Sequence, residues 1–438
     1  KRERAEAGPP GRLEALSGDP FAALEALLAR YRGQGPRAWS PGLPPFLGGA
    51  VGYLGYEMLY AIEDIPDLGR DDLPLPDAYV MFCDTVLASD SQLKKSWLTT
   101  TAWADSEAQA NARANERMIE NIRRLKGISR LTESPRTDAM RQTRREILAA
   151  RPRLTEEHLR EMGIRPVIDR AGYLGLVEAA KEHIFAGDVF EVCTSNRFDT
   201  ETSIAGAELY RLLSTVSEAP FSSYLRFPEA EVVSSSPERF LRLDRDGWAE
   251  TRPIKGTRPR GRTPREDELS MADLQSSEKD NAENIMIVDV ARNDLGRVCE
   301  FGSISVPELR VVETYPFTHQ LVSTVRGRLA RDRTPFDLIR ASFPGGSMTG
   351  APKVEAMKII DRLEPVKRGI FSGAIGYFEG AFDLSIVIRT LIKKGEHLTF
   401  HVGGAIVADS EPEAEYQETL DKAHGMVVAL EMAKRETP

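Results

Sequence analysis

Apolar side chains recur every three or four residues near the C-terminal end of the chain. Ser410-Glu411-Pro412 is a favourable helix start, because serine accepts a hydrogen bond at the first turn and proline tolerates the first helical position. The residues that would then share one apolar face are Tyr416, Leu420, Ala423, Val427 and Leu430. This spacing predicts a long helix with one face buried in a core.

The N-terminal region shows two shorter patterns. Pro20 to Tyr31 has the spacing of an amphipathic helix, with Asp19 as its expected N-cap. Residues 46–53 read Phe-Leu-Gly-Gly-Ala-Val-Gly-Tyr, which predicts a strand approached closely by other backbone. After Arg165, strand and helix patterns alternate densely to the end of the chain.

Residues 104–164 differ from the rest in composition. They are rich in Arg, Glu, Ala, Ser and Gln, and Met118, Ile122 and Leu125 stand at helical spacing. We expect an exposed helix followed by a mobile connector from Ser129 to Pro152. A solvated linker is the simpler interpretation, and a charged interaction arm is the alternative.

Composition excludes several classes of protein. The chain has 438 residues, of which 41% are hydrophobic and 29% are charged, so it is long enough for one large core or two domains. A formal net charge of −9 argues against a nucleic-acid partner. We find no apolar run of 18 residues and expect neither membrane insertion nor a signal peptide. The three cysteines lie far apart and fit neither a zinc site nor a disulfide framework, so we expect a reducing, cytoplasmic location. The chain opens with Lys1, and we expect it to be truncated at its N-terminus.

One segment combines a lysine with a constrained backbone: Arg-Pro-Ile-Lys-Gly-Thr-Arg-Pro-Arg-Gly, residues 252–261. Pro253 and Pro259 fix the backbone, and Gly256 allows a ligand to approach closely, so Lys255 and the amides of Gly256 and Thr257 suit a small anion. A solvated surface turn explains the same residues without any ligand.

Two acidic pairs stand at helical spacing. Asp280 and Glu283 are three residues apart, and so are Glu415 and Glu418, with Lys422 four residues further on. Such faces are usually solvated helix surface. If both pairs converge, their oxygens suit Mg²⁺, which prefers carboxylates and keeps positions open for water and substrate.

A glycine-rich loop, Phe-Pro-Gly-Gly-Ser-Met-Thr-Gly-Ala-Pro-Lys, occupies residues 343–353 and leads into a predicted helix. Its amides and the Ser347 hydroxyl suit a small carboxylate, and the loop lacks the order of a Walker motif. Arg389 lies in an apolar run, residues 386–390, which predicts a buried strand whose arginine needs an anion, either a ligand or an internal partner. Glu238 and His319 complete the candidate acid and base groups.

Taken in order, these segments resemble the chorismate-utilising enzymes, which include anthranilate synthase component I, aminodeoxychorismate synthase component I, and the isochorismate and salicylate synthases. The matching motifs include S-S-P-E-R, P-I-K-G-T-R-P-R-G, A-E-N-I-M-I-V-D-V-A-R-N-D-L-G-R-V, F-P-G-G-S-M-T-G-A-P-K, I-R-T and I-V-A-D-S-x-P-x-x-E-Y-Q-E-T. The resemblance implies an α+β fold in which two large antiparallel β-sheets form a sandwich with helices outside. Residues 1–103 would form the N-terminal part of the sandwich, 104–164 the charged helix and connector, and 165–438 the chorismate-binding catalytic region.

The choice of branch depends on Lys255. Anthranilate synthases typically have alanine there, whereas the lysine is similar to aminodeoxychorismate synthase, in which it acts as the nucleophile. The residue after Gly-Asp-Val-Phe, Glu191, is lysine in the water-using branches and glutamine in better-known ammonia users, so its role here is open. Anthranilate synthase is the alternative, and a non-catalytic binding subunit is a more distant one.

The resemblance also implies roles for individual residues. Glu283 and Glu418 would bind Mg²⁺ directly, and Asp280 and Glu415 would hold its waters. Lys255, Glu238 and His319 would be catalytic. The expected contacts to chorismate are Gly256, Thr257, Ser347, Arg389, Gly403, Gly404, Ala405 and Lys422.

Three further expectations follow. Attack by Lys255 requires its neutral form, so we expect a lowered pKa, with Arg252 and Arg258 as contributors. Phe371 and Ala405 replace a usual tyrosine and glycine. The cysteines (Cys83, Cys193 and Cys299) lack the glycine-flanked context of a glutaminase nucleophile, so ammonia would come from a glutamine amidotransferase, either a separate subunit or a trimmed-off domain.

Overall fold

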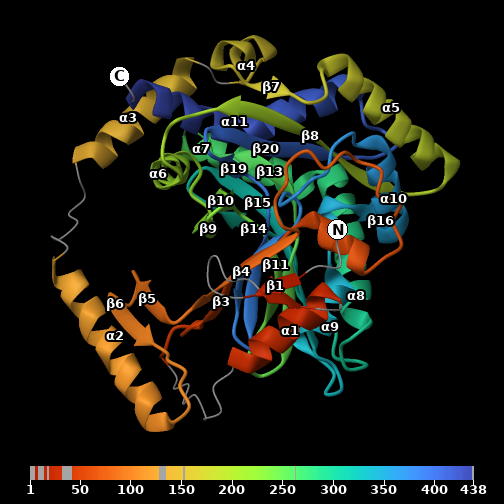
Figure 1. Ribbon diagram of the computed structural model, residues 1–438. Helices are drawn as coiled ribbons and strands as arrows, with labels where there is room; N and C mark the ends of the chain where they lie inside the picture. The colour runs from red at the N-terminus through yellow and green to blue at the C-terminus, as the bar shows by residue number, and fades with distance from the viewer. Residues whose placement is uncertain are drawn as a thin grey trace.

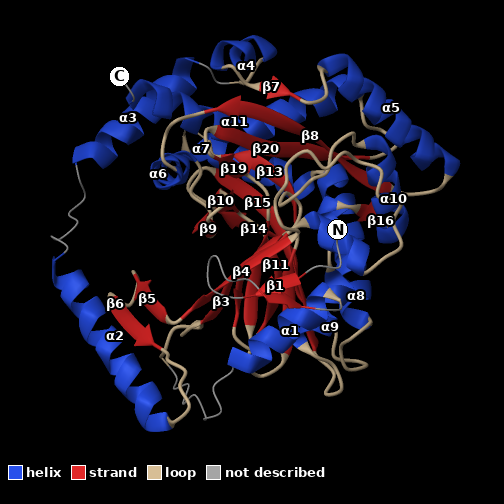
Figure 2. Cartoon of the chain, viewed as in Figure 1, coloured by secondary structure: helices blue, strands red, loops and turns tan. Residues whose placement is uncertain are grey.

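The computed structural model describes residues 5–7, 14–16, 19–31, 42–127, 135–150, 153–261 and 263–436. Two large β-sheets form its centre, and helices lie outside them (Figures 1 and 2). Neighbouring strands run antiparallel in both sheets. The expected fold class, a two-sheet antiparallel sandwich with external helices, is confirmed.

The first sheet has seven strands in the order β16-β8-β20-β19-β10-β9, with β7 paired to β8. Their bounds are β7 Arg165–Pro166, β8 Glu191–Glu201, β9 Phe221–Arg226, β10 Glu231–Ser236, β16 Gly350–Ala351, β19 Thr390–Lys394 and β20 His397–Ile406. The ladder between β8 and β20 is the longest, because ten residues of each strand pair from His397↔Glu201 to Ile406↔Val192.

The second sheet has nine strands in the order β13-β15-β12-β11-β18-β17-β3-β4, with β14 paired to β15. Their bounds are β3 Gly49–Leu54, β4 Ala78–Cys83, β11 Arg239–Leu243, β12 Trp248–Arg252, β13 Ile254–Pro259, β14 Ser305–Thr314, β15 Thr318–Arg328, β17 Ala374–Phe378 and β18 Phe382–Ile386. The strand expected at residues 46–53 is present as β3, three residues later than its predicted start.

An apolar cluster joins the two sheets. Tyr53 and Ile375 reach it from the nine-stranded sheet, and Val232 and Ile392 from the seven-stranded sheet; all four are buried. Because apolar area removed from water stabilises by about 25 cal/mol per Å², this cluster favours face-to-face packing of the sheets.

Helices cover the outer faces. α5 (Arg170–Ala186), α6 (Gly206–Val216) and α11 (Pro412–Glu436) pack around the seven-stranded sheet, and α1 (Pro20–Tyr31), α8 (Glu278–Gly296) and α9 (Pro335–Ser342) pack on the nine-stranded sheet. Every residue of the predicted apolar stripe of α11 is buried, which confirms that helix. The predicted start of α1 is confirmed as well, since the amide of Ala22 donates to Asp19 Oδ2 at 2.8 Å.

The remaining elements are shorter or peripheral. They are β1 Ala5–Ala7, β2 Glu14–Leu16, η1 Tyr56–Ala61, β5 Thr85–Asp90, β6 Lys95–Thr100, α2 Glu107–Gly127, α3 Pro135–Ala150, α4 Glu156–Met162, α7 Pro264–Ser276, η2 Gly346–Met348 and α10 Lys353–Leu363. In Figure 1, α2 and the β5–β6 hairpin stand apart from the two-sheet body.

The charged segment after residue 104 is only partly as expected. The exposed helix is present as α2, in which none of the residues is buried. The mobile connector predicted from Ser129 to Pro152 is wrong for residues 135–150, because they form α3 and bury Met140 and Ile147 in the core around α11. The parts of that prediction at 129–134 and 151–152 lie outside the described residues.

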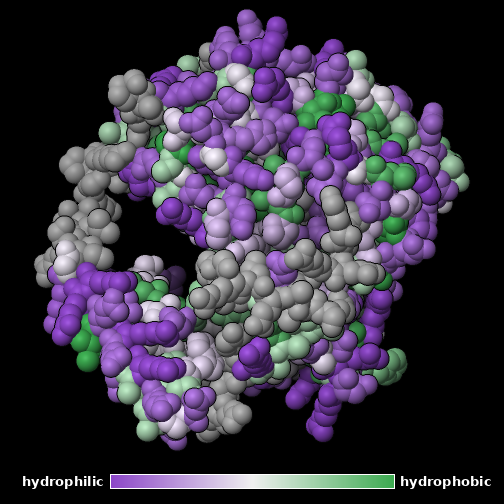
Figure 3. Space-filling model, in the orientation of Figure 1, coloured by the Kyte–Doolittle hydropathy of each residue, from purple (hydrophilic) through white to green (hydrophobic). Residues whose placement is uncertain are grey.

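The face of the molecule in Figure 3 is predominantly hydrophilic. Of the helices that the structure describes, none combines the length and the apolar character needed to span a bilayer.

Candidate functional site

The candidate residues gather where the chain passes between the two sheets. Glu238 follows β10 of one sheet and precedes β11 of the other, and Arg389 lies between β18 and β19 in the same way. Backbone hydrogen bonds hold these two connections, because the amide of Ile386 donates to the Glu238 carbonyl at 3.0 Å and that of Ser235 to the Arg389 carbonyl at 3.1 Å. The crossings therefore place two opposite charges at one point.

Lys255 and Glu191 form an ion pair between the sheets. Lys255 lies on β13 and Glu191 opens β8, and Lys255 Nζ donates to Glu191 Oε1 at 2.8 Å. The Glu191 residue is 0% exposed and Lys255 is 9% exposed. Cys193 lies beside the pair, with its Sγ 3.6 Å from the same Glu191 oxygen. A charge buried this deeply needs a partner, and each of these two residues supplies it for the other.

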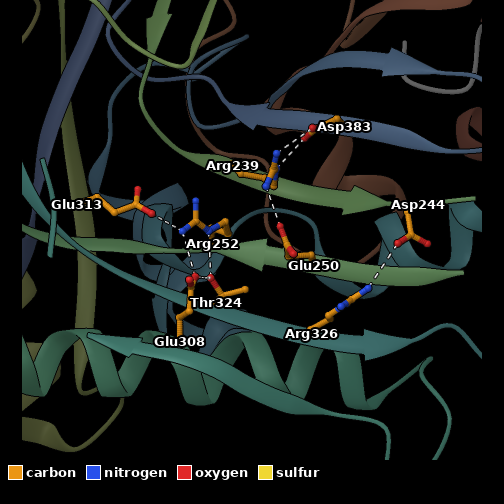
Figure 4. Close-up of polar contacts among 9 residues, drawn as sticks. All are labelled: Arg239, Asp244, Glu250, Arg252, Glu308, Glu313, Thr324, Arg326 and Asp383. Atoms are coloured by element: carbon orange, nitrogen blue, oxygen red, sulfur yellow. Dashed lines mark hydrogen bonds and ion pairs between the residues drawn. The ribbon is translucent and has the colours of Figure 1, made fainter. Parts of the chain in front are cut away.

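This pair overturns the expected pKa of Lys255. Burial lowers the pKa of Lys255, but the negative charges of Glu191 and Glu283 outweigh burial and hold that pKa above its ordinary range. The two arginines expected to lower this pKa are bound to other side chains. Figure 4 shows Arg252 bonded to Glu308, Glu313 and Thr324 on the nine-stranded sheet.

Arg258 is likewise engaged away from the lysine. Its guanidinium donates to Asp273 Oδ2 at 2.5 Å and to Asp280 Oδ2 at 2.9 Å. Asp280 is therefore bound by an arginine. Glu283, the other member of this acidic pair, lies on the same helix, α8.

Glu238 is buried and has the properties of a proton donor. Ser347 Oγ, from η2 in the glycine-rich loop, donates to Glu238 Oε1 at 2.7 Å. Burial raises the pKa of Glu238 to about 7, although the Ser347 hydroxyl and the charge of Lys255 act in the opposite direction. Such a carboxyl group retains a proton to near-neutral pH, which suits general acid catalysis.

Arg389 has no internal ion-pair partner among the described residues, so the alternative of a structural salt bridge is not observed. The segment around it is also not a strand, because residues 387–389 connect β18 to β19 and Arg389 adopts a positive φ of 48°. Burial lowers the pKa of Arg389, and the charge of Glu238 opposes the shift. A guanidinium placed this way can bind a ligand carboxylate by donating hydrogen bonds to it.

The glycine segment of β20 lies next to the Lys255–Glu191 pair, because Ala405 pairs with Cys193 and Gly404 with Thr194. Beyond Phe400 the neighbouring strand β19 has ended, so this edge of β20 has no strand beside it among the described residues. Lys422 Nζ donates to the Gly403 carbonyl at 2.7 Å. The other backbone groups on this free edge are available to a ligand.

Gly404 permits close approach of the acidic face of α11. A β-carbon at this position would lie 3.1 Å from Glu415 Oε2, 3.5 Å from Glu418 Oε1 and 3.9 Å from Lys422 Nζ. The expected grouping of these three side chains on one helix face is confirmed, and Lys422 pairs with Glu418 at 2.8 Å.

The acidic pairs fit Mg²⁺ in ligand chemistry. Glu283 Oε1 and Glu415 Oε2 are buried and lack a hydrogen-bond partner, as cation-binding oxygens do before the ion is bound. Burial raises the pKa of both residues, and the ammonium group of Lys279 opposes the shift at both. Lys279, on α8, therefore lies within electrostatic reach of Glu283 on its own helix and of Glu415 on α11. Within the described residues, no group of three or more acidic, His or Cys side chains is close enough to hold an ion. Convergence of the two pairs therefore stays a prediction.

Two of the predicted residues, His319 and Thr257, form no hydrogen bond or ion pair with Lys255 or Glu238 among the described residues. His319 Nε2 lies 2.9 Å from Asp267 Oδ1, and its Nδ1 lies 2.9 Å from Thr314 Oγ1. Thr257 is exposed on β13, although Gly256 beside it has the expected positive φ of 86°.

Sequence reasoning missed the partner of Lys255. Glu191 stood out only as a departure at a motif position, and Cys193 only as a cysteine without a catalytic context. The 64 positions between Lys255 and Glu191 hid their contact, because it depends on how the two sheets face each other.

Comparison with known proteins gives a matching family model and several relatives. Residues 1–428 match the family model described as chorismate binding enzyme. The chain is 47% identical over 401 residues to an aminodeoxychorismate synthase of Streptomyces pristinaespiralis, covering 90% of this chain but 52% of that protein. It is 41% identical to aminodeoxychorismate synthase component 1 of Klebsiella aerogenes, over 88% of this chain and 78% of the relative.

A solved structure of anthranilate synthase component I from Streptococcus pneumoniae aligns with a TM-score of 0.78 and 29% identity, covering 98% of this chain and 90% of that chain. The chain thus spans about half the length of the Streptomyces pristinaespiralis relative and most of the length of the other two. Together with the family model, these matches show that the chain belongs to the chorismate binding enzyme family.

Proposed function

We propose that this chain is the synthase part of an aminodeoxychorismate synthase, which converts chorismate and ammonia to 4-amino-4-deoxychorismate and water. The observation that carries the proposal is Lys255, a buried amine on β13 in electrostatic reach of the buried acid Glu238. The relatives named aminodeoxychorismate synthase support the same reaction.

Chorismate carries two carboxylates, and the site offers separate groups for them. Arg389, which has no ion-pair partner among the described residues, and the free edge of Gly403–Ala405 would hold the enolpyruvyl carboxylate. The Gly256 backbone, with Thr257 and Lys422, would lie at the ring carboxylate. Ser347 would orient Glu238 beside the substrate.

The chemistry of the chain's own residues follows from these positions. Lys255 Nζ would form a bond to the ring carbon adjacent to the carboxylate-bearing carbon, and the C4 hydroxyl would leave as water with the proton of Glu238. Ammonia would then bond to C4, the bond to Lys255 would break, and the Glu238 carboxylate would recover a proton from the new ammonium group. The lysine and the acid return to their starting states.

Mg²⁺ bound by Glu283 and Glu418, with Asp280 and Glu415 at its waters, would neutralise the ring carboxylate. Ammonia would come from a glutamine amidotransferase, as a subunit or as a domain of a longer protein. His319 would be a further catalytic residue. It lies on β15, the strand next to β13, and Asp267 and Thr314 hold its ring in place.

Anthranilate synthesis is the second candidate. It is supported by the alignment with anthranilate synthase component I from Streptococcus pneumoniae, which covers nearly all of this chain. Lys255 favours the first candidate. Aminodeoxychorismate formation would use this lysine as its nucleophile, whereas direct attack by ammonia, as in anthranilate synthesis, needs no lysine.

Product identification separates the two. Purified chain is incubated with chorismate, Mg²⁺ and ammonium at pH 8, and the products are separated by chromatography with mass detection. We expect 4-amino-4-deoxychorismate without pyruvate release. Anthranilate with pyruvate would support the second candidate, and unchanged chorismate would support a binding-only role.

A further inference from the structure

The proposed mechanism gives no role to the buried carboxylate of Glu191. Its Oε1 accepts from Lys255 Nζ at 2.8 Å and lies 3.6 Å from Cys193 Sγ, whereas its Oε2 is buried with no hydrogen-bond partner. An orphaned carboxylate oxygen in a fully buried position costs free energy unless the group is used.

The ion pair also poses a chemical problem. An ammonium group has no lone pair, so Lys255 cannot attack while it holds three protons. In the described part of the chain, Glu191 is the hydrogen-bond acceptor of Lys255 Nζ, and no other ion pair reaches that atom. A proton that leaves Lys255 toward a protein group therefore has one short path.

We propose that Glu191 is the internal proton acceptor and positioning residue of Lys255. One proton moves from Nζ to Oε1 along the existing hydrogen bond, and the nitrogen gains the lone pair that attacks. When the bond to the lysine breaks at the end of the cycle, the proton returns to Nζ. This inference rests on the proposed function for its catalytic part, but the coupling between the two side chains does not.

Low polarity makes the transfer feasible. With Glu191 0% exposed and Lys255 9% exposed, water cannot fully stabilise the charged form of the pair. The neutral pair, carboxylic acid and amine, is then much closer in free energy to the ion pair than it would be in water. Because the proton stays within the pair, the amount of attacking amine does not depend on the pH of the solvent.

Other titratable groups also face Lys255. These are Cys193 on β8, Glu283 on α8, Glu238 at the β10–β11 connection and, at longer range, Glu418 on α11. None of them is changed by the substitutions below, so their effect is common to all variants.

The first experiment needs no activity. The substrate-free chain is methylated with formaldehyde and dimethylamine–borane between pH 6 and 11, and the initial labelling rate of Lys255 is measured by peptide mass spectrometry. In wild type, the labelling rate of Lys255 should still be rising at pH 11, because the charge of Glu191 holds the pKa of Lys255 above its ordinary range. In Glu191→Gln, we expect a labelling midpoint below pH 11, because the partner charge is lost and burial lowers the pKa of the lysine. Glu191→Asp keeps the carboxylate, so Lys255 should be labelled as in wild type.

The control is a second buried lysine, Lys367, which is ion-paired with both Asp361 and Asp67. Lys367 Nζ lies 2.9 Å from Asp361 Oδ1, and both side chains are less than 10% exposed. Asp361→Asn should leave the labelling of Lys255 unchanged. Labelling of Lys367 in the Glu191 variants reports whether the fold is intact. A pH profile of Lys255 labelling in folded Glu191→Gln that is identical to the wild-type profile overturns the proposal.

The second experiment measures kcat/KM for chorismate at constant free ammonia. The wild-type profile should stay within about twofold between pH 6 and 7, since the pair exchanges its proton internally. Glu191→Gln should acquire an acid limb, with a tenfold loss per pH unit below the labelling midpoint measured for that variant. A profile identical to wild type would overturn the proton-acceptor role. A shifted labelling midpoint in a chain that never consumes chorismate would instead refute the proposed function and leave the coupling intact.

Discussion

Ser347 Oγ donates a hydrogen bond of 2.7 Å to Glu238 Oε1, although 109 positions separate the two residues. The bond joins the glycine-rich loop to the connection between the two sheets, so the loop orients the proposed acid. It also stabilises the charged form of Glu238 and thereby limits how far burial raises the pKa.

The first prediction concerns this hydrogen bond. Ser347→Ala should raise the pKa of Glu238 above its value of about 7, because burial then acts with less opposition. If Glu238 is the acid, the basic limb of the pH profile should move to higher pH. Ser385→Ala is the control, because its buried hydroxyl donates to the Ile375 carbonyl instead. A basic limb that does not move would separate Glu238 from the rate-limiting proton transfer.

The second prediction links Glu238 to stability. Its folded pKa of about 7 lies above the ordinary value of 4.5, so the folded state binds more protons between these values and loses stability as the pH rises through them. Glu238→Gln should therefore unfold with a free energy up to about 3 kcal/mol higher at pH 8, and with little change at pH 4.5. Urea titrations at the two pH values measure the difference.

The same variant should lose activity by about 10²- to 10⁴-fold, which is the usual contribution of general acid catalysis. A more stable and inactive protein is the expected combination. A variant that is less stable than wild type at pH 8 would contradict the assigned cost of burying this carboxylate.

The third prediction tests the metal. Excess chelator, Glu283→Gln or Glu418→Gln should abolish turnover, because each removes a proposed oxygen ligand or the ion itself. Glu278→Gln is the matched control, since it lies exposed on the same helix as Glu283. Calorimetry of Mg²⁺ binding to each variant gives a readout that does not depend on activity. Full turnover in excess chelator would exclude the metal from the reaction.

The fourth prediction concerns the nitrogen source. Ammonium salts should support turnover by the purified chain, whereas glutamine should not until a glutaminase is added. Burial raises the pKa of the Cys193 thiol to about 12 and that of the Cys299 thiol to about 11, so neither is a ready thiolate nucleophile. Release of glutamate from glutamine by the chain alone would refute this prediction.

Local patterns predicted much of the fold. The apolar stripe of α11 and the capping residue of α1 depend on neighbours within a few positions, and the structure confirms both. The burial of α3 was missed, because Met140 and Ile147 stand among charged residues and their burial depends on the distant helix α11.

The site was harder to predict because its contacts are long-range. Motif positions indicated Lys255, Glu238 and Arg389, but not that two of them lie where the chain changes sheets. The sign of the Lys255 pKa shift was wrong because a neighbour on another sheet, Glu191, decides it.

The central claim is that Lys255 is a covalent nucleophile, and product analysis of Lys255→Ala tests it most directly. Wild type and variant are incubated with chorismate, Mg²⁺ and ammonium, and both products are quantified. We expect the variant to bind chorismate but to form 4-amino-4-deoxychorismate about 100-fold more slowly, equivalent to about 2.7 kcal/mol in the barrier. Lys255→Arg should fail as well, since a guanidinium keeps its charge. A variant that keeps the wild-type rate and product, or a wild-type chain that makes only anthranilate, would contradict the account.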